Sequence, residues 1–161
     1  MKKWFFLLLI LIAVFIEVAF LGSFRIFNAK PNLLLILVVI ASLSFELRWA
    51  IFFCIIAGAL KDIFCADAFC LNALMFALWS FLIAKLSREI TIDNYLVSTI
   101  LVFFVVFFSD IVIRLVFAYS GKYVPLGIFL RIAFLESLYT MLVAPLVFKI
   151  VKPEFYSSPF A

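Results

Sequence analysis

The sequence predicts an all-α integral membrane protein, a bundle of six transmembrane helices in a single domain. Of its 161 residues, 70% are hydrophobic and 14% are charged, against roughly 45–50% and about 25% in soluble domains. A soluble globule of this size could not cover so much apolar surface. Disorder is excluded as well, because disordered chains are poor in aromatic and branched apolar residues.

Six apolar stretches come close to the roughly 20 helical residues that cross a hydrocarbon core. The predicted spans are Trp4–Gly22, Pro31–Phe45, Arg48–Cys65, Phe69–Leu86, Tyr95–Ala118 and Leu126–Lys149. The break between the second and third spans depends on Glu46-Leu47-Arg48 alone. The stretch from Pro31 to Cys65 is too long for one span at 1.5 Å per residue, so two helices with a tight turn are predicted.

The first stretch also resembles a signal peptide, because Lys2 and Lys3 precede an apolar run. No clean small-x-small cleavage site follows it, and Glu17 lies at the edge of the run. We therefore expect an uncleaved first span.

Lys and Arg in the loops predict the orientation. With the N-terminus inside, the inner side carries seven basic residues and the outer side three, and both termini are cytoplasmic. The inner residues are Lys2, Lys3, Arg48, Lys85, Arg88, Lys149 and Lys152; the outer ones are Arg25, Lys30 and Lys122. The predicted location is the bacterial inner membrane.

Seven charged residues fall inside the predicted spans, although each costs at least about 2.5–3.5 kcal/mol at a helix centre. All lie in the outer half of the bilayer or near its midplane, and they form a predicted outward polar layer. Its members are Glu17, Lys61, Asp62, Asp110, Arg114, Arg131 and Glu136.

Spacing indicates some of their pairing. Asp110 and Arg114 are four residues apart and share a helix face. Arg131 and Glu136 diverge by about 140° on a helix, so each is expected to pair with another helix. Structural ion pairs, a polar groove for a partner or small ligand, and snorkelling to the headgroups all fit this layer.

Little other chemistry is visible. The chain has four Gly and no His, so a glycine-rich phosphate loop is ruled out and the commonest general base is missing. No catalytic residue, metal ligand or cofactor-binding residue is predicted, and no nucleic-acid partner. Cys65 and Cys70 flank a short outer loop, where a disulfide is conceivable in an oxidising compartment.

One ordered set of motifs is more distinctive than the composition. Lys30-Pro31-Asn32 opens the second span, Gly58-Ala59-Leu60-Lys61-Asp62 lies in the third, and Ala68-Phe69-Cys70-Leu71-Asn72 leads into the fourth. This order resembles the rod shape-determining membrane protein family MreD. Phe69-Cys70 stands where that family commonly has a Leu-Gly pair, and Lys61 stands where a neutral or apolar residue is commoner. The matching positions are Pro31, Asn32, Gly58, Asp62 and Asn72.

The resemblance implies a non-enzymatic scaffold subunit of the cell-elongation machinery. Such a subunit binds MreC, lies near MreB, RodA and a penicillin-binding transpeptidase, and helps position side-wall peptidoglycan synthesis. It implies a capping or pairing role for Asp62 and a polar contact for Asn72.

The family also resembles the substrate-binding subunits of energy-coupling-factor transporters in fold. The alternative function is therefore a vitamin-binding transport subunit. An integral membrane enzyme is the least favoured hypothesis, because no acid and base are paired beside a nucleophile.

Overall fold

The computed structural model describes residues 2–19, 30–65, 70–89, 95–119, 121 and 125–155. These residues form six α-helices and no strand, which confirms the all-α class. The helices are α1 (Lys2–Ala19), α2 (Leu33–Ser44), α3 (Leu47–Cys65), α4 (Leu71–Glu89), α5 (Tyr95–Tyr119) and α6 (Leu126–Phe155). The loop residues Arg25 and Lys122 and the predicted outer loop Ala66–Ala68 lie outside the described residues.

The short helix α2 is the centre of the molecule. It packs against all five other helices, and every residue from Leu34 to Ser42 is buried. A helix that is apolar on all sides is stable only when it is surrounded by protein or by lipid. Twelve residues span about 18 Å, less than the roughly 30 Å of a hydrocarbon core. Because protein surrounds α2, the neighbouring helices cover it, and the short helix does not itself have to match the thickness of the lipid.

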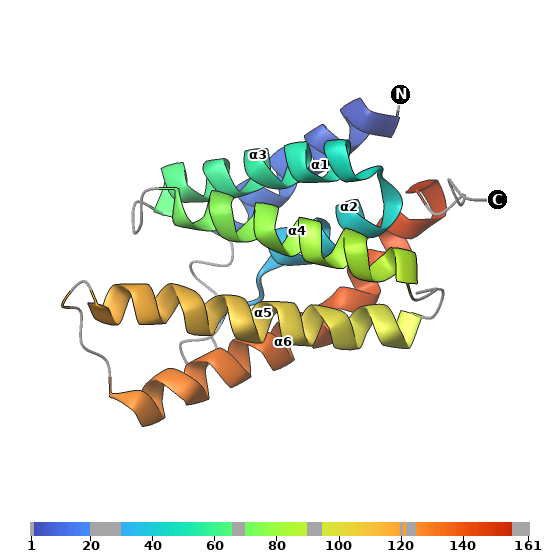
Figure 1. Cartoon of the computed structure of the whole chain (residues 1–161). Coiled ribbons are helices and arrows are strands. Elements are labelled where there is room, and N and C mark those ends of the chain that lie inside the picture. The colour runs from blue at the N-terminus through green and yellow to red at the C-terminus, as the bar shows by residue number, and fades with distance from the viewer. Residues whose placement is uncertain are drawn as a thin grey trace.

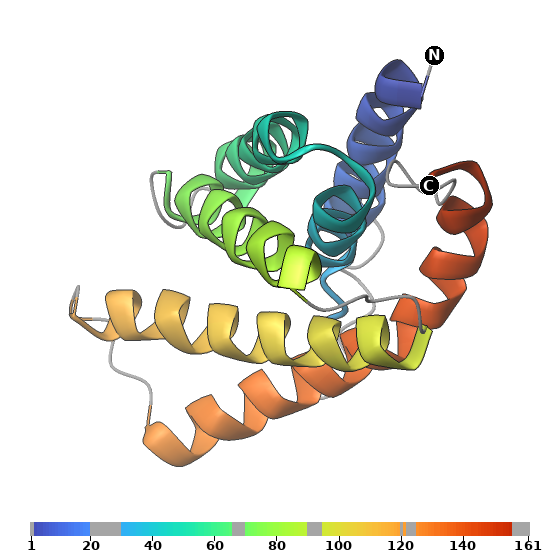
Figure 2. The ribbon, with the colours of Figure 1, turned by 45° about the vertical axis from the view of Figure 1, so that its right-hand side comes forward.

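The other helices lie around α2 in the order α1, α3, α4, α5, α6, each packed on the next. In Figure 2, α5 and α6 form one layer, and α1, α3 and α4 lie on the other side of α2. Successive helices run in opposite directions, so α1 begins and α6 ends at the same end of the bundle (Figure 1). We call the opposite end, where α1, α3 and α5 end, the polar end.

Two helical segments are long and apolar enough to cross a membrane: Leu96–Tyr119, with 24 residues, and Gly127–Val151, with 25 residues. Leu33–Ser44 and Leu71–Ser87 are shorter apolar helices. The structure thus singles out two of the six predicted spans by length and hydropathy. Charged residues near the ends of α1 and α3 weaken the same signal there, α2 has only 12 residues, and the apolar part of α4 is Leu71–Ser87.

The break between α2 and α3 falls at Phe45 and Glu46. The backbone of Phe45 is extended, and its N–H still donates to the Ala41 carbonyl. The Phe45 ring lies 5.1 Å from that of Phe6 and 5.2 Å from that of Phe53, centroid to centroid. This aromatic contact between α1, the turn and α3 holds the tight connection in place.

Helix α6 is longer than predicted, since it continues past Lys149 to Phe155. Its C-terminal part bends away from the direction of its first turns (Figures 1 and 2). Pro145 lies in that part, and a proline inside a helix removes one hydrogen bond and displaces the preceding turn.

The outer surface is apolar on all five helices that surround α2. Exposed examples are Trp4, Ile63, Leu74, Leu96 and Ile150, one from each. So much exposed apolar surface is compatible with lipid and not with water.

Candidate functional site

Six of the seven members of the polar layer are buried or half-buried and gathered at the polar end of the bundle. Glu17 is 3% exposed, and Asp110 and Glu136 are each 8% exposed. A buried charge is tolerated only with a partner, because desolvation costs several kcal/mol per ion. The partners of these groups therefore decide what the layer does.

Glu17 joins three helices. Its Oε1 lies 3.1 Å from Lys61 Nζ of α3, a contact that is ionic rather than a well-directed hydrogen bond. Its Oε2 accepts a hydrogen bond of 3.2 Å from the backbone N–H of Leu34. That N–H belongs to the first turn of α2, where a helix has free donors and favours negative charge.

Asn32 completes the N-terminus of α2. Its side-chain oxygen accepts from Leu35 N at 3.2 Å, as an N-cap residue does. Its backbone N–H donates to Thr140 Oγ1 of α6 at 3.0 Å, and the Thr140 hydroxyl donates to the Glu136 carbonyl at 2.7 Å. The start of the central helix is thus fixed to α1 on one side and α6 on the other.

A second ion pair joins α5 to α6. Arg114 Nη2 donates to Glu136 Oε2 at 3.0 Å. Asp110, one turn before Arg114, interacts electrostatically with Glu136, Arg114 and Lys61, but its Oδ2 is buried without a hydrogen-bond partner. The Arg114 ion pair therefore runs to the neighbouring helix rather than to Asp110 on its own helix.

Asp62 points away from Lys61 and caps α4 from a different helix. Its Oδ1 accepts from the backbone N of Asn72 at 3.2 Å and from Asn72 Nδ2 at 2.7 Å, and its Oδ2 accepts from Ala73 N at 3.1 Å. Cys70, just before α4, could not supply such a cap, because a thiol is a poor acceptor. A carboxylate from α3 replaces the missing local cap.

Gly58 lies one turn before Asp62, where the α3 and α4 backbones meet. A Cβ added at Gly58 would lie 2.4 Å from Ala73 Cα and 2.7 Å from the Asn72 carbonyl oxygen. The absence of a side chain lets the two helices approach closely enough for Asp62 to reach the first turn of α4.

Arg131 is not brought together with the other members of the layer. Its side chain is exposed, and among the described side chains it forms no ion pair with an acid. Its depth in the span placed it in the predicted layer, but its direction on α6 is away from Glu136.

Sequence reasoning did not single out three further residues. Thr140 and Ser109 are fully buried at this end, and Lys30 interacts electrostatically with Glu136. Thr140 follows Glu136 by four residues, so the helical period would have found it. Lys30 was assigned to the loop before the second span and was not placed in the polar layer.

The arrangement contains no recognisable reaction centre among the residues that the structure describes. No three His, Cys, Asp or Glu side chains there are placed to hold a metal ion. Cys54 is buried and Cys70 exposed, and both are free thiols; the side chain of Cys65 lies outside the part of the chain that the structure describes.

Comparison of the chain with models of protein families shows which family it belongs to. The family model for the rod shape-determining protein MreD matches residues 1–154, nearly the whole chain. The chain belongs to the MreD family. Members are membrane proteins with a role in determining rod shape, which agrees with the two long apolar helices found here. No curated protein and no solved structure matches the chain, so a likeness in fold to energy-coupling-factor subunits is not shown.

The positions that carry the MreD resemblance take part in two contacts of the polar end. Pro31 and Asn32 form the start of α2, and Gly58, Asp62 and Asn72 form the contact between α3 and α4. Cys70, just before α4, has a φ of 60°. Glycine adopts this left-handed backbone conformation without strain, so the Gly that the resemblance implies would fit at this position.

Proposed function

We propose that this chain is a non-enzymatic scaffold subunit of the rod complex in the bacterial inner membrane. It binds MreC and helps position side-wall peptidoglycan synthesis, in a complex with RodA, a penicillin-binding transpeptidase and MreB. The match of the MreD family model over residues 1–154 is the observation that carries this proposal.

In this proposal all six helices form the membrane domain, with both chain ends in the cytoplasm. The apolar surface of α1, α3, α4, α5 and α6 supports this. The excess of Lys and Arg at the end where α1 begins and α6 ends supports the orientation. The polar end then faces the periplasm.

The contacts at the polar end support a scaffold. Glu17, Lys61, Asp62 and Glu136 are paired with other groups of the same chain, and they hold helix ends together in one arrangement. We assign these four to structural pairing. A rigid bundle presents the same surface to its partners at all times, which lowers the entropy cost of assembly.

The partner contacts are assigned to the basic side chains of the α5–α6 pair. Arg131 is exposed, and the Arg114 side chain, though paired with Glu136, is 28% exposed. An exposed Arg within a membrane span is costly on its own and is stabilised by an acid or a carbonyl of a partner. We therefore place part of the MreC interface at the exposed Arg131 of α6.

The test is purification of a tagged, full-length chain in mild detergent with identification of what accompanies it. We expect MreC with the wild-type chain, and at least tenfold less MreC with Arg131→Glu. Lys149→Glu is the matched control, because Lys149 is also exposed on α6 but at the opposite end.

Depletion of the chain in rod-shaped cells is the second arm. Rounding of the cells is expected; cells that keep their shape and width would contradict the scaffold role. A vitamin-sized molecule that purifies with the chain in place of MreC would favour the transport alternative.

A further inference from the structure

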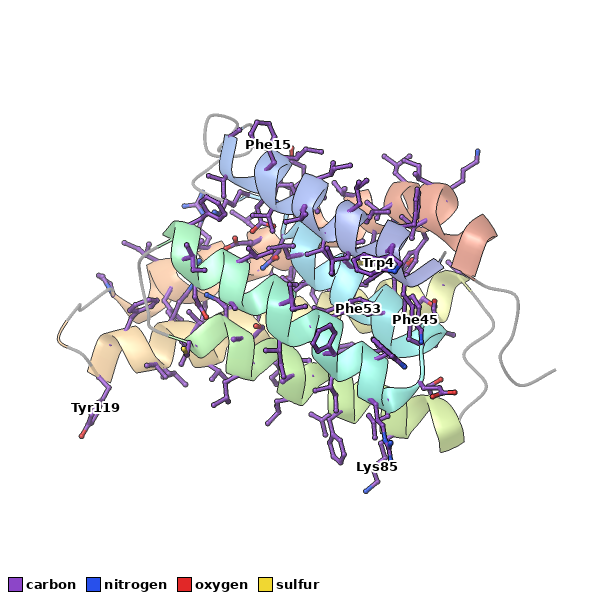
Figure 3. The ribbon with its side chains drawn as sticks, turned by 90° about the horizontal axis from the view of Figure 1, so that it is seen from above. Trp4, Phe15, Phe45, Phe53, Lys85 and Tyr119 are labelled. Atoms are coloured by element: carbon purple, nitrogen blue, oxygen red, sulfur yellow. The ribbon has the colours of Figure 1, made fainter. Side chains whose placement is uncertain are left out.

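The end of the bundle opposite the polar end carries a group of exposed basic side chains. Lys3 lies at the start of α1, Arg48 at the start of α3 and Lys85 near the end of α4, and all three are exposed. We call these three residues the basic patch. Figure 3 shows Trp4, Phe45 and Lys85 toward one end of the molecule and Tyr119 at the other.

The register of α3 against α4 places Arg48 and Lys85 at nearly the same height in the bundle. These antiparallel helices meet where Gly58 faces Ala73. From that point Arg48 lies ten residues, or about 15 Å, back along α3, and Lys85 lies twelve residues, or about 18 Å, forward along α4. Both side chains therefore extend from adjacent helices at nearly the same height in the bundle.

Lys3 joins the patch through an aromatic ring. Its Nζ lies 3.7 Å from the centroid of the Trp49 ring, a cation–π contact that ties the start of α1 to the start of α3. Trp49 is the direct neighbour of Arg48 on α3, so Lys3 and Arg48 lie at the same end of the bundle and at nearly the same height.

Two tryptophans place the patch at the membrane surface. Trp4 is 79% exposed and Trp49 is 40% exposed. Indole rings with an apolar body and a polar N–H concentrate at the level of the lipid headgroups. Lys and Arg side chains beside them extend into the same layer, within reach of phosphate groups.

Counted over the side chains that the structure describes, the patch carries a net positive charge. Among the described side chains, Lys3, Arg48 and Lys85 form no ion pair with an acid, whereas Lys61 and Arg114 do. The described acid beside the patch is Glu46, which is exposed. With three basic groups and one acid, the local charge is positive and fits an anionic ligand.

We propose that the basic patch, flanked by Trp4 and Trp49, is a binding site for the headgroup of an anionic phospholipid. Basic groups at a membrane surface gain about fivefold in affinity for anionic lipid per charge, and the two indoles hold the site at headgroup depth. The basic residues of α1, α3 and α4 select the lipid by the charge of its headgroup, and α6 contributes no residue to the site. This goes beyond the scaffold role and needs no protein partner.

The experiment uses the purified full-length chain in mild detergent, with bound lipid measured by native mass spectrometry. Phosphatidylglycerol and phosphatidylcholine with the same acyl chains are the probes. We expect tighter retention of phosphatidylglycerol by the wild type. The preference for phosphatidylglycerol should fall about fivefold with each neutralised side chain. The fall should therefore be smallest in the single variants, larger in Arg48→Gln/Lys85→Gln and largest in Lys3→Gln/Arg48→Gln/Lys85→Gln.

The matched control is Arg131→Gln/Lys149→Gln, which also removes exposed basic groups but outside the patch. It should keep the wild-type preference. The proposal would be overturned if the triple variant kept its preference for phosphatidylglycerol, or if the control lost that preference equally. A retained preference in the triple variant would reassign the patch to an acidic segment of a protein. The double variant keeps the Lys3–Trp49 contact and is decisive should the triple variant lose its fold, as judged by its melting temperature without added lipid.

Discussion

At Gly58 the backbones of α3 and α4 meet without a side chain between them. Gly58→Ala would place a Cβ 2.4 Å from a backbone atom of Ala73, which cannot rotate away. Overpacking of this kind costs about 1–3 kcal/mol, so we expect a clear fall in the melting temperature of the detergent-solubilised protein. Gly127→Ala is the control, because nothing lies within 4 Å of its added Cβ. Equal stability of the two variants would show that α3 and α4 are not in this close contact.

Cys70 holds a strained backbone that glycine would relieve. A left-handed residue with a Cβ costs about 1–2 kcal/mol, whereas the added freedom of Gly in the unfolded chain costs about 0.4–1 kcal/mol. Strain relief is the larger effect, so Cys70→Gly should stabilise the protein by roughly 0.5–1 kcal/mol. Ala77→Gly, inside α4, should destabilise it by about 1 kcal/mol. Thermal unfolding of both variants checks the sign, and destabilisation by Cys70→Gly would refute the strain.

The Glu17–Lys61 pair should be worth more as a pair than either residue is alone. Removing one partner of a buried pair leaves an uncompensated charge at a cost of about 3–5 kcal/mol, while replacing both is often nearly neutral. We therefore expect Glu17→Gln and Lys61→Met each to be destabilising and the double variant to recover much of the loss. A double-mutant cycle of melting temperatures measures the coupling. Strict additivity of the two single effects would argue against the ion pair.

At the level of residues, the sequence predicts how far each charged residue lies from the membrane surface, but not the direction in which its side chain points. The spacing along each span placed Glu17 and Arg131 at similar distances from the outer surface, yet Glu17 is buried and paired and Arg131 is exposed. Which side of a helix faces the bundle depends on the order of the helices in space, and a single sequence does not contain that order.

At the level of elements, α2 should respond to substitution differently from every helix around it. Leu34, Leu35, Ile36 and Leu37 are consecutive and all at most 1% exposed, so each change to Ala should cost about 2–5 kcal/mol. In α1, Ile10 is 1% exposed while Leu8 and Leu11 are about half exposed. There only Ile10→Ala should be severe. Melting temperatures of the seven variants test this, and a helical period in the α2 series would mean that α2 lies at the surface.

The element boundaries show what hydropathy detects. The break at Glu46 was predictable because polar residues interrupt an apolar run that is too long for one span. The extension of α6 to Phe155 was not, because hydropathy reports where lipid ends rather than where backbone hydrogen bonding ends. The enclosed position of α2 was missed for a related reason: a fully buried helix and a lipid-facing helix have the same apolar composition.

At the scale of the whole molecule, the two ends of the bundle differ in chemistry. One end keeps its charges buried and paired, as Glu17 with Lys61 and Arg114 with Glu136. The other end leaves Lys3, Arg48, Lys85 and Lys149 exposed. Exposed basic residues stay on the cytoplasmic side during insertion, so this difference between the ends predicts how the chain lies in the membrane.

Labelling of single cysteines in spheroplasts with a membrane-impermeant maleimide tests that orientation. In a Cys65→Ser/Cys70→Gly background, the remaining Cys54 is buried and should not react. We expect Tyr119→Cys, at the polar end, to be labelled in intact spheroplasts, because Tyr119 is 96% exposed. Glu46→Cys and Lys149→Cys, at the other end, should be labelled only after lysis. The reverse pattern would invert the orientation, and labelling at both ends before lysis would refute a bundle that crosses the membrane.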